Sequence, residues 1–530
     1  NTFGTISGAI SGTGTAALVK MDLGTWTLTG VNTFTGRVTV ANGTLTLGSA
    51  NALAPSVPVS VSGGTFDLGG FAVTSSAVTV SGGVLSNGAV FATSFACTDA
   101  GTVTTPLSGT MGVAKSGSGT LVLSGMNSYA GATTVNGGVL QFAKRTALYG
   151  GDTAQWTADN IIVNSGATLA LNVGGDGEFT SSDVGLLAGL GSAAGGYKSG
   201  SILGLNTTNA AGGIFTCASV IGSLGGNMLS VNKLGSGTLA LGDANTYTGA
   251  TRISQGVLSV ACITNGGIAS GIGMSSPRSD NLVFAGGALR YTGPSTRTDR
   301  GFKYAALTNA YIFDVAQSNT VLTFGSISNA TFAGSDTTLV KTGPGTLVFG
   351  KGPGPTYNFP VKAIYVMEGS YQTEAGNVLQ HNLHCLASQG PALLLGDGAE
   401  MGFNNPVENY TSGDEMMVQY VGTQRCARVT CLPGSSWLLC GPTTNSAGVL
   451  LYNTHVFNVN DGTDDVDLDI RCTLSLYPGN ANSYLRKTGA GTLRLNSGSN
   501  SLRGTTVIRS GRLLVTASVP KGGNSVLGNC

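Results

Sequence analysis

Apolar and polar residues alternate in short runs along most of the chain, and each run ends at Asn or Gly. In the run 120–123, Leu121 and Leu123 point to one side and the residues between them to the other. Two more short runs follow at 133–135 and 139–142, separated by an Asn-Gly-Gly corner. Because Gly and Asn tolerate the positive φ of sharp corners, we expect three strands to form one triangular coil of a solenoid.

This three-strand frame recurs along the chain as an internal repeat. Its clearest copies lie near residues 115–142 and 233–260 and within the C-terminal segment 481–530, and degenerate copies lie near 20–48 and 341–371. Each copy begins with a lysine, and these lysines are unevenly spaced: Lys20, Lys115, Lys233, Lys341 and Lys487. The uneven spacing indicates larger modules with insertions between them.

The stretches between the copies have the same strand-corner-strand pattern. We expect a β-solenoid over residues 1–369, an irregular Cys-rich part or insertion over 370–480, and a C-terminal repeat copy with the last coils over 481–530. Each coil should take roughly 20–25 residues. The segment Ser182–Leu190 is the best helix candidate, with Ser or Asp placed to cap it. The predicted fold class is all-β, a single long parallel β-helix with a loop-rich insertion.

Composition narrows the class of protein. Glycine accounts for 84 of 530 residues, charged residues for 10 % and hydrophobic residues for 41 %, which excludes a disordered tail. The glycines have no three-residue period, which excludes collagen. A net charge of +1 argues against nucleic acid or an anionic membrane as a partner. No apolar run is long enough to predict a membrane-spanning helix.

The copies resemble the autotransporter-associated β-strand repeat, also called the passenger-associated transport repeat. The resemblance rests on Lys-x-Gly-x-Gly-Thr-Leu-x-Leu, then Asn-x-Tyr-x-Gly-x-Thr and Gly-x-Leu, all present between Lys233 and Val260. It implies a right-handed parallel β-helix that is exported and lives on the bacterial cell surface or outside the cell. It implies no reaction, because the repeat is architectural. The nine cysteines depart from the family pattern, which is poor in cysteine.

Cysteine and histidine gather in the irregular part of the chain. The disulfide candidates are Cys426, Cys431, Cys440 and Cys472, and an extracellular location favours their pairing. One alternative is a metal site that also draws on His381, His384, Cys385 and His455, although the spacings match no known zinc pattern. The other alternative is a set of buried free thiols.

Three further groups of residues invite a chemical interpretation. The segment 345–352 has the spacing of a phosphate loop, but Gly352 replaces the required Ser or Thr, which favours a strand corner. Arg297, Asp299 and Arg300 are interpreted as a solvated corner, with a grip on an anionic glycan as the alternative. The densest acidic run is interpreted as a strand with outward carboxylates; its residues are Asp461, Asp464, Asp465, Asp467 and Asp469.

Two alternatives remain for the acidic run: calcium bound between adjacent corners, and paired catalytic carboxylates. Repeated asparagines are expected to cap corners and repeated aromatics to fill the core; these are Asn32, Asn127, Asn245 and Asn500, with Phe34, Tyr129 and Tyr247. Only three histidines leave little capacity for general-base catalysis. We therefore expect no cofactor, calcium being the one alternative.

The sequence predicts a non-enzymatic extracellular structural protein, a β-solenoid subunit of a surface fibre or filament assembled end to end. Its partners would be copies of itself, joined through strand edges near Thr5, Ile6 and Ile10 and near Leu513, Leu514 and Val515, with Cys530 able to lock the joint. The alternative is an autotransporter-like surface adhesin that acts as a single rod and contacts cell-surface glycans or another cell through residues 370–480. A polysaccharide-active β-helix enzyme is least favoured, because charge is sparse.

Overall fold

The computed structural model describes most of residues 3–350 and a set of shorter segments up to residue 516. The described ranges are 3–12, 16–192, 195–305, 310–326, 337–350, 357–361, 363–373, 379–383, 393–396, 399–403, 407–408, 415–421, 426–431, 436–438, 453–471, 473–475, 483–496 and 506–516. The chain divides into two compact units, residues 1–251 and 252–530.

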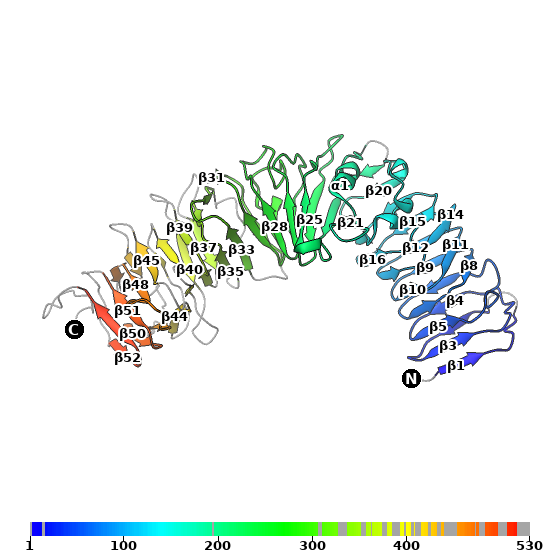
Figure 1. The fold of residues 1–530 in the computed structure, drawn as a ribbon, viewed down its shortest axis with the longest axis horizontal. Coiled ribbons are helices and arrows are strands. Elements are labelled where there is room, and N and C mark those ends of the chain that lie inside the picture. Colours follow the sequence, from blue (N-terminus) through cyan, green and yellow to red (C-terminus); the bar gives the residue numbers. More distant parts are fainter. Residues whose placement is uncertain are drawn as a thin grey trace, which may run out of the picture. The chain divides into compact units, whose positions relative to one another are not determined.

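Three parallel sheets form the sides of the first unit (Figure 1). The longest contains β1 (Phe3–Ile6), β3 (Thr25–Leu28), β5 (Thr44–Leu47), β7 (Thr65–Asp67), β10 (Val84–Ser86), β13 (Gly101–Val103), β16 (Thr120–Leu123), β19 (Val139–Phe142), β21 (Thr168–Asn172), β23 (Ile202–Asn206) and β25 (Ser230–Leu234). The second contains β2 (Leu18–Lys20), β4 (Val38–Val40), β6 (Val59–Val61), β9 (Val78–Val80), β12 (Phe95–Cys97), β15 (Val113–Lys115), β18 (Thr133–Val135), β20 (Ile161–Val163) and β22 (Gly196–Tyr197). The third contains β8 (Ala72–Ser75), β11 (Ala89–Ala92), β14 (Leu107–Gly109) and β17 (Ser128–Tyr129), while β24 (Ile214–Cys217) pairs with β26 (Thr238–Leu241).

These sheets confirm the predicted parallel β-helix and its three-sided coil. Leu121 and Leu123 of β16 are fully buried while Thr120 and Val122 are half-buried on the outer side, as the period of two predicts. Early coils are short, since Thr120 pairs with Val139. Later coils are longer than expected: Val139 pairs with Thr168, and Thr168 with Ile202. The extra length lies in loops and a helix that are inserted at the corners.

The predicted helix is α1 (Ser181–Ala188), and it packs against β24 in the first unit. Its cap is Thr180, whose side chain accepts a hydrogen bond from the Asp183 backbone, and Asp183 reciprocates in a capping box. The N-cap therefore lies two residues before Ser182, while Asp183, also suggested by the sequence, takes part in the cap from the third position of the helix. Short 3-10 turns occur at η1 (Arg145–Ala147), η2 (Tyr149–Gly151), η3 (Thr153–Gln155), η4 (Ala211–Gly213) and η5 (Ser279–Asn281).

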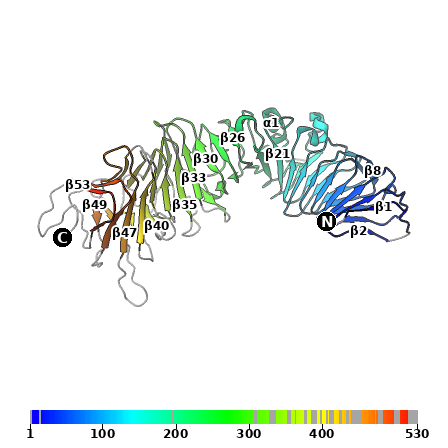
Figure 2. The same cartoon turned by 60° about the horizontal axis from the view of Figure 1, so that its bottom comes forward.

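The second unit repeats the same construction, and Figure 2 shows β30, β33 and β35 side by side in it. One sheet contains β28 (Val257–Val260), β30 (Ala288–Tyr291), β33 (Ala310–Val315), β35 (Thr338–Thr342), β38 (Ala363–Val366), β41 (Leu393–Leu395), β44 (Glu415–Tyr420), β47 (Asn453–Val459), β50 (Ser483–Thr488) and β52 (Thr506–Ile508). Another contains β31 (Thr296–Thr298), β34 (Val321–Phe324), β36 (Thr346–Phe349), β39 (Ser370–Thr373), β42 (Glu400–Phe403), β45 (Ala427–Cys431), β48 (Leu468–Ile470), β51 (Thr492–Leu495) and β53 (Arg512–Val515). β29 (Leu282–Phe284) pairs with β32 (Lys303–Tyr304). Two short sheets consist of β37 (Tyr357–Val361) with β40 (Leu379–Leu383), and of β43 (Val407–Glu408) with β46 (Ser436–Leu438) and β49 (Thr473–Ser475).

Aromatic rings fill part of the core of the second unit. Phe302 lies 5.2 Å from Phe313 and 5.4 Å from Phe324 between ring centroids, in near-perpendicular arrangements. Phe349 extends this cluster to Tyr371 at 5.6 Å. Such edge-to-face pairs add to the stabilisation from burial alone. Among the described residues, the structure has no helix long and apolar enough to cross a membrane.

Candidate functional site

The first corner of each repeat copy is built around its lysine. Lys115 ends β15 on the inward side and is fully buried. Its Nζ donates to the carbonyl oxygens of Gly117 at 3.1 Å and of Gly137, one coil further along, at 3.2 Å. Gly117 has a φ of +70°, which turns its carbonyl toward this ammonium and which a residue with a side chain rarely adopts. The lysine therefore joins two successive coils at the corner.

The same corner recurs in the second unit. Lys341 Nζ donates to the carbonyls of Thr342 and Gly343, both at 2.7 Å, and to that of Glu368 at 3.2 Å. Lys487 Nζ donates to the carbonyls of Thr488 and Gly489 at 2.7 Å and of Ser510 at 3.2 Å. Burial lowers the pKa of Lys341 and of Lys487 to about 8. These lysines have an architectural role that the sequence analysis did not assign.

The repeated asparagines and aromatics occupy the places that the sequence predicted. Asn127 Oδ1 accepts from the backbone of Leu107 at 2.9 Å, and its Nδ2 donates to the carbonyl of Ala147 at 2.6 Å, so it caps two coils. Tyr129 is buried, with its hydroxyl 2.8 Å from Thr133 Oγ1. The predictions are confirmed in the other copies too, at Asn32, Asn245, Phe34 and Tyr247. Asn500 lies outside the described residues.

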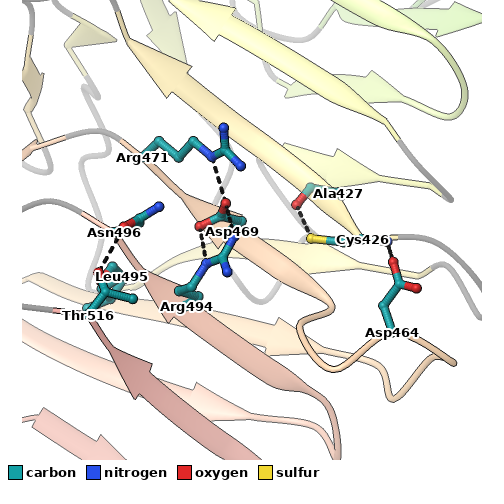
Figure 3. A network of polar contacts seen from close by, with 9 residues as sticks. All are labelled: Cys426, Ala427, Asp464, Asp469, Arg471, Arg494, Leu495, Asn496 and Thr516. Atoms are coloured by element: carbon teal, nitrogen blue, oxygen red, sulfur yellow. Dashed lines mark hydrogen bonds and ion pairs between the residues drawn. The ribbon is translucent and has the colours of Figure 1, made fainter.

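On the C-terminal coils the carboxylate of Asp469 lies between Arg471 and Arg494 (Figure 3). Asp469 of β48 is fully buried and accepts from Arg494 Nε at 2.8 Å and from Arg471 Nε at 2.7 Å. Although burial by itself would raise the pKa of Asp469, hydrogen bonds from the two guanidinium groups outweigh it and lower that pKa. Arg471 and Arg494 keep 43 % and 27 % of their side chains exposed, so their outer sides face solvent.

The expectation of outward, solvated carboxylates along the acidic run is wrong for two of its members. Asp467 is buried and accepts from the backbone of Gly462 and of Thr492, both at 2.7 Å. Asp469 is covered by its arginines. Asp461, Asp464 and Asp465 are exposed, and Asp464 also accepts from the backbone of Cys426 at 2.7 Å. Three carboxylates of the run therefore hold neighbouring backbone or arginines, and the described residues include no group of three metal-ligating side chains.

The interpretation of Arg297, Asp299 and Arg300 as a solvated corner needs correction at Arg300. This side chain is only 3 % exposed. Its guanidinium donates to the carbonyls of Thr264 at 2.8 Å and Gly273 at 2.9 Å and to Ser275 Oγ at 3.1 Å. It therefore organises the loop 264–275 from inside and is not available to a glycan. Asp299 supports the same loop, since its Oδ1 accepts from the backbone of Gly266 at 2.8 Å.

The predicted assembly residues are described only in part. Thr5 and Ile6 pair with Thr27 and Leu28 through β1, and the backbone of Ile10 donates to Asn32 Oδ1. Leu513, Leu514 and Val515 pair with β51 through β53, and Cys530 lies outside the described residues. These observations leave assembly through either edge as a prediction.

The cysteine predictions fall largely outside the described side chains. Cys426 Sγ donates to the carbonyl of Ala427 at 3.2 Å, and Cys97 and Cys217 in the first unit are buried free thiols. The side chains of Cys431, Cys440 and Cys472, and those of His381, His384, Cys385 and His455, lie outside the described residues. In the segment 345–352, Thr346–Phe349 forms strand β36, while Lys351 and Gly352 are not described.

Comparisons with known proteins agree with this architecture. The sequence model of the passenger-associated-transport-repeat matches residues 18–47, 113–142, 231–260 and 485–515. The copy at Lys341 lies outside these ranges, yet its lysine makes the same corner bonds. The chain is 38 % identical over 253 residues to a Brucella suis protein named adhesin BmaC autotransporter, a match that covers 44 % of this chain and 7 % of that protein. No solved structure matches significantly.

The chain thus spans a small part of the length of the curated relative that it matches. Each matched range begins two residues before the buried lysine of its copy and ends with the third strand of the coil, as β15 to β19 show for the range 113–142. The repeat and the relative together indicate a secreted protein of the cell surface, as the sequence predicted. This chain is a parallel β-helix that carries passenger-associated-transport repeats.

Proposed function

We propose that this chain is part of an autotransporter-type surface adhesin, a β-helical passenger that holds its outer side toward another cell. The observation that carries the proposal is the similarity over 253 residues to a protein named as an autotransporter adhesin. The construction supports it, because the repeat residues point inward to hold the coils and leave the outer positions to vary. The comparisons favour this alternative over the filament subunit that the sequence analysis put first.

A passenger of this kind needs no catalytic centre, and we propose that the chain has no enzymatic activity. The acidic run supports this, because its buried carboxylates are committed to backbone amides and arginines. A screen on uronate-containing polysaccharides should show no release of unsaturated or reducing ends above the level of a heat-inactivated sample. Turnover of such a polymer would contradict the proposal.

The adhesin proposal is tested by coating beads with the purified chain and measuring their attachment to epithelial cell monolayers. We expect saturable attachment that soluble chain competes away and that beads coated with heat-denatured chain do not show. Attachment no greater than that of albumin-coated beads would overturn the proposal. Negative-stain electron microscopy of the same sample, with and without reductant, separates the two assembly hypotheses. We expect single particles; filaments lost in reductant would instead support end-to-end assembly locked by a cysteine.

A further inference from the structure

Charge is segregated sharply along the C-terminal part of the chain, although the net charge of the whole is only +1. Residues 396–469 contain ten acidic residues against Arg425 and Arg428. From residue 471 to the last residue there is no Asp or Glu, while six arginines and two lysines are present: Arg471, Arg486, Arg494, Arg503, Arg509, Arg512, Lys487 and Lys521. A net charge near zero therefore hides an acidic stretch followed directly by a basic one.

The structure shows that several of these arginines lie on consecutive coils. Arg494 of β51 pairs in register with Asp469 of β48, and Thr492 of the same strand pairs with Arg512 of β53. Arg509 lies between β52 and β53, and both Arg509 and Arg512 are exposed. Neighbouring coils are about 4.8 Å apart. Because Arg494 pairs with Leu514 and Arg512 with Thr492, the cationic groups run obliquely across successive coils. We call Arg471, Arg494, Arg509 and Arg512 the C-terminal arginines.

Asp469 orients part of this surface without neutralising it. It accepts from both Nε and Nη2 of Arg494 but from Nε alone of Arg471, whose terminal nitrogens point away from it (Figure 3). Two positive charges share one negative charge there, and the register places Arg512 on the next coil. The planar guanidinium group is suited to bind sulfate or carboxylate with two parallel hydrogen bonds. Several such groups on successive coils can contact more than one anion of a linear polymer at the same time.

We propose that the C-terminal arginines bind a linear sulfated polysaccharide of the kind found on animal cell surfaces. The choice of a polysaccharide over another polyanion rests on the proposed adhesin function, because a secreted surface protein meets glycans before it meets nucleic acid. Exposed carboxylates before these coils, such as Glu400 and Asp461, disfavour binding of the polymer there. This site replaces the anionic-glycan grip considered at Arg297 and Arg300, where Arg300 is buried.

The test is retention of the whole chain on immobilised heparin at pH 7 in a salt gradient, with dissociation constants from surface plasmon resonance. The variant R509A/R512A removes two exposed arginines that make no ion pair with Asp469. The matched control R37A/R278A removes two exposed arginines elsewhere, Arg37 in the first unit and Arg278 in the second. Both variants lower the net charge by two. Thermal unfolding of each variant checks that it is folded.

We expect R509A/R512A to weaken heparin binding at least tenfold and R37A/R278A to change it less than twofold. Equal losses in the two variants, or no loss in R509A/R512A, would overturn the proposal. Duplex DNA that competes as effectively as soluble heparin, at the same concentration of negative charge, would also overturn the proposal, because the site would then bind any polyanion. The bead assay separates the two proposals. If beads coated with the wild-type chain attach to cells but the chain does not bind heparin, the polysaccharide site is refuted and the adhesin function is not.

Discussion

Two copies of the repeat, at 113–142 and 485–515, are alike inside and different outside. From Lys115 to Leu123 and from Lys487 to Leu495 the two copies share the lysine, both glycines, the Thr-Leu pair and the final leucine. In both, the leucines are buried and the lysine donates to corner carbonyls. The outward position between the leucines is Val122 in one copy and Arg494 in the other. The comparison teaches that the coil dictates its inner residues and leaves the outer ones to function.

The largest expected effect tests the shared interior. Leu123→Ala and Leu495→Ala should each lower the free energy of unfolding of their part of the β-helix by about 2–5 kcal/mol, because each leaves a cavity in a close-packed core. Both leucines are essentially unexposed, so the two losses should be similar. Urea unfolding followed by circular dichroism measures them. A loss in one copy only would break the comparison.

The buried lysines provide the next test. Lys115→Met and Lys487→Met keep the apolar stem but leave the corner carbonyls without a donor, and we expect each to cost about 1–3 kcal/mol. The reason is that Lys115 serves Gly117 and Gly137 and that Lys487 serves Gly489 and Ser510. Hydrogen exchange of the corner amides locates the loss. Unchanged exchange in either variant would show that the lysine is not needed for the corner.

A substitution of Asp469 tests the outer side of the C-terminal copy, where Asp469 pairs with Arg494. The copy at 113–142 has Val122 in place of this arginine. Asp469→Asn should cost about 1–2 kcal/mol, because it weakens three charge-assisted hydrogen bonds from two partly exposed arginines. The matched control is Asp280→Asn, which removes an exposed carboxylate paired with Arg278 and Lys303. That change should cost less than about 0.5 kcal/mol. Equal losses from thermal unfolding would contradict a special role for Asp469.

The smallest effect is a dependence of stability on pH. Lys341 and Lys487 have a pKa near 8 in the fold, below the usual value for an unfolded lysine, so the unfolded chain binds more protons between pH 8 and about 10. Stability should therefore rise over that window, by at most about 1.4 kcal/mol per pH unit for each lysine. Burial raises the pKa of Tyr371 well above its usual value, so stability should fall again above about pH 10 as unfolded tyrosine ionises.

A pH series of melting temperatures measures this profile. Lys487→Met removes one titrating group and should flatten the rise between pH 8 and 10. A stability that falls steadily from pH 8 upward, or a rise that is unaltered in Lys487→Met, would contradict the assignment.

Most of the interior was predictable because it follows a period of two. Leu121, Asn127 and Tyr129 were all interpreted correctly from the alternation and from the corner residues. The same alternation places Lys115 inward, two residues after Val113, so the pattern alone predicts that Lys115 is buried. The sequence analysis did not make this prediction, because lysine is rarely buried in proteins. The aromatic cluster around Phe302 could not be read in this way, because Phe302 lies outside any strand and its partners Phe313 and Phe324 belong to two different sheets.

The sequence by itself determined the class of fold, the repeat and its corners, since each depends on residues that are neighbours along the chain or recur in the same order. Only the tertiary structure decided which charges are buried and which are exposed. Arg300 turned out to be enclosed by a loop and Asp469 to lie between two arginines, whereas Arg512 faces solvent. The physical reason is that burial of a charge depends on partners from other coils, and the register that brings those coils together is set by the inserted loops and not by the local pattern.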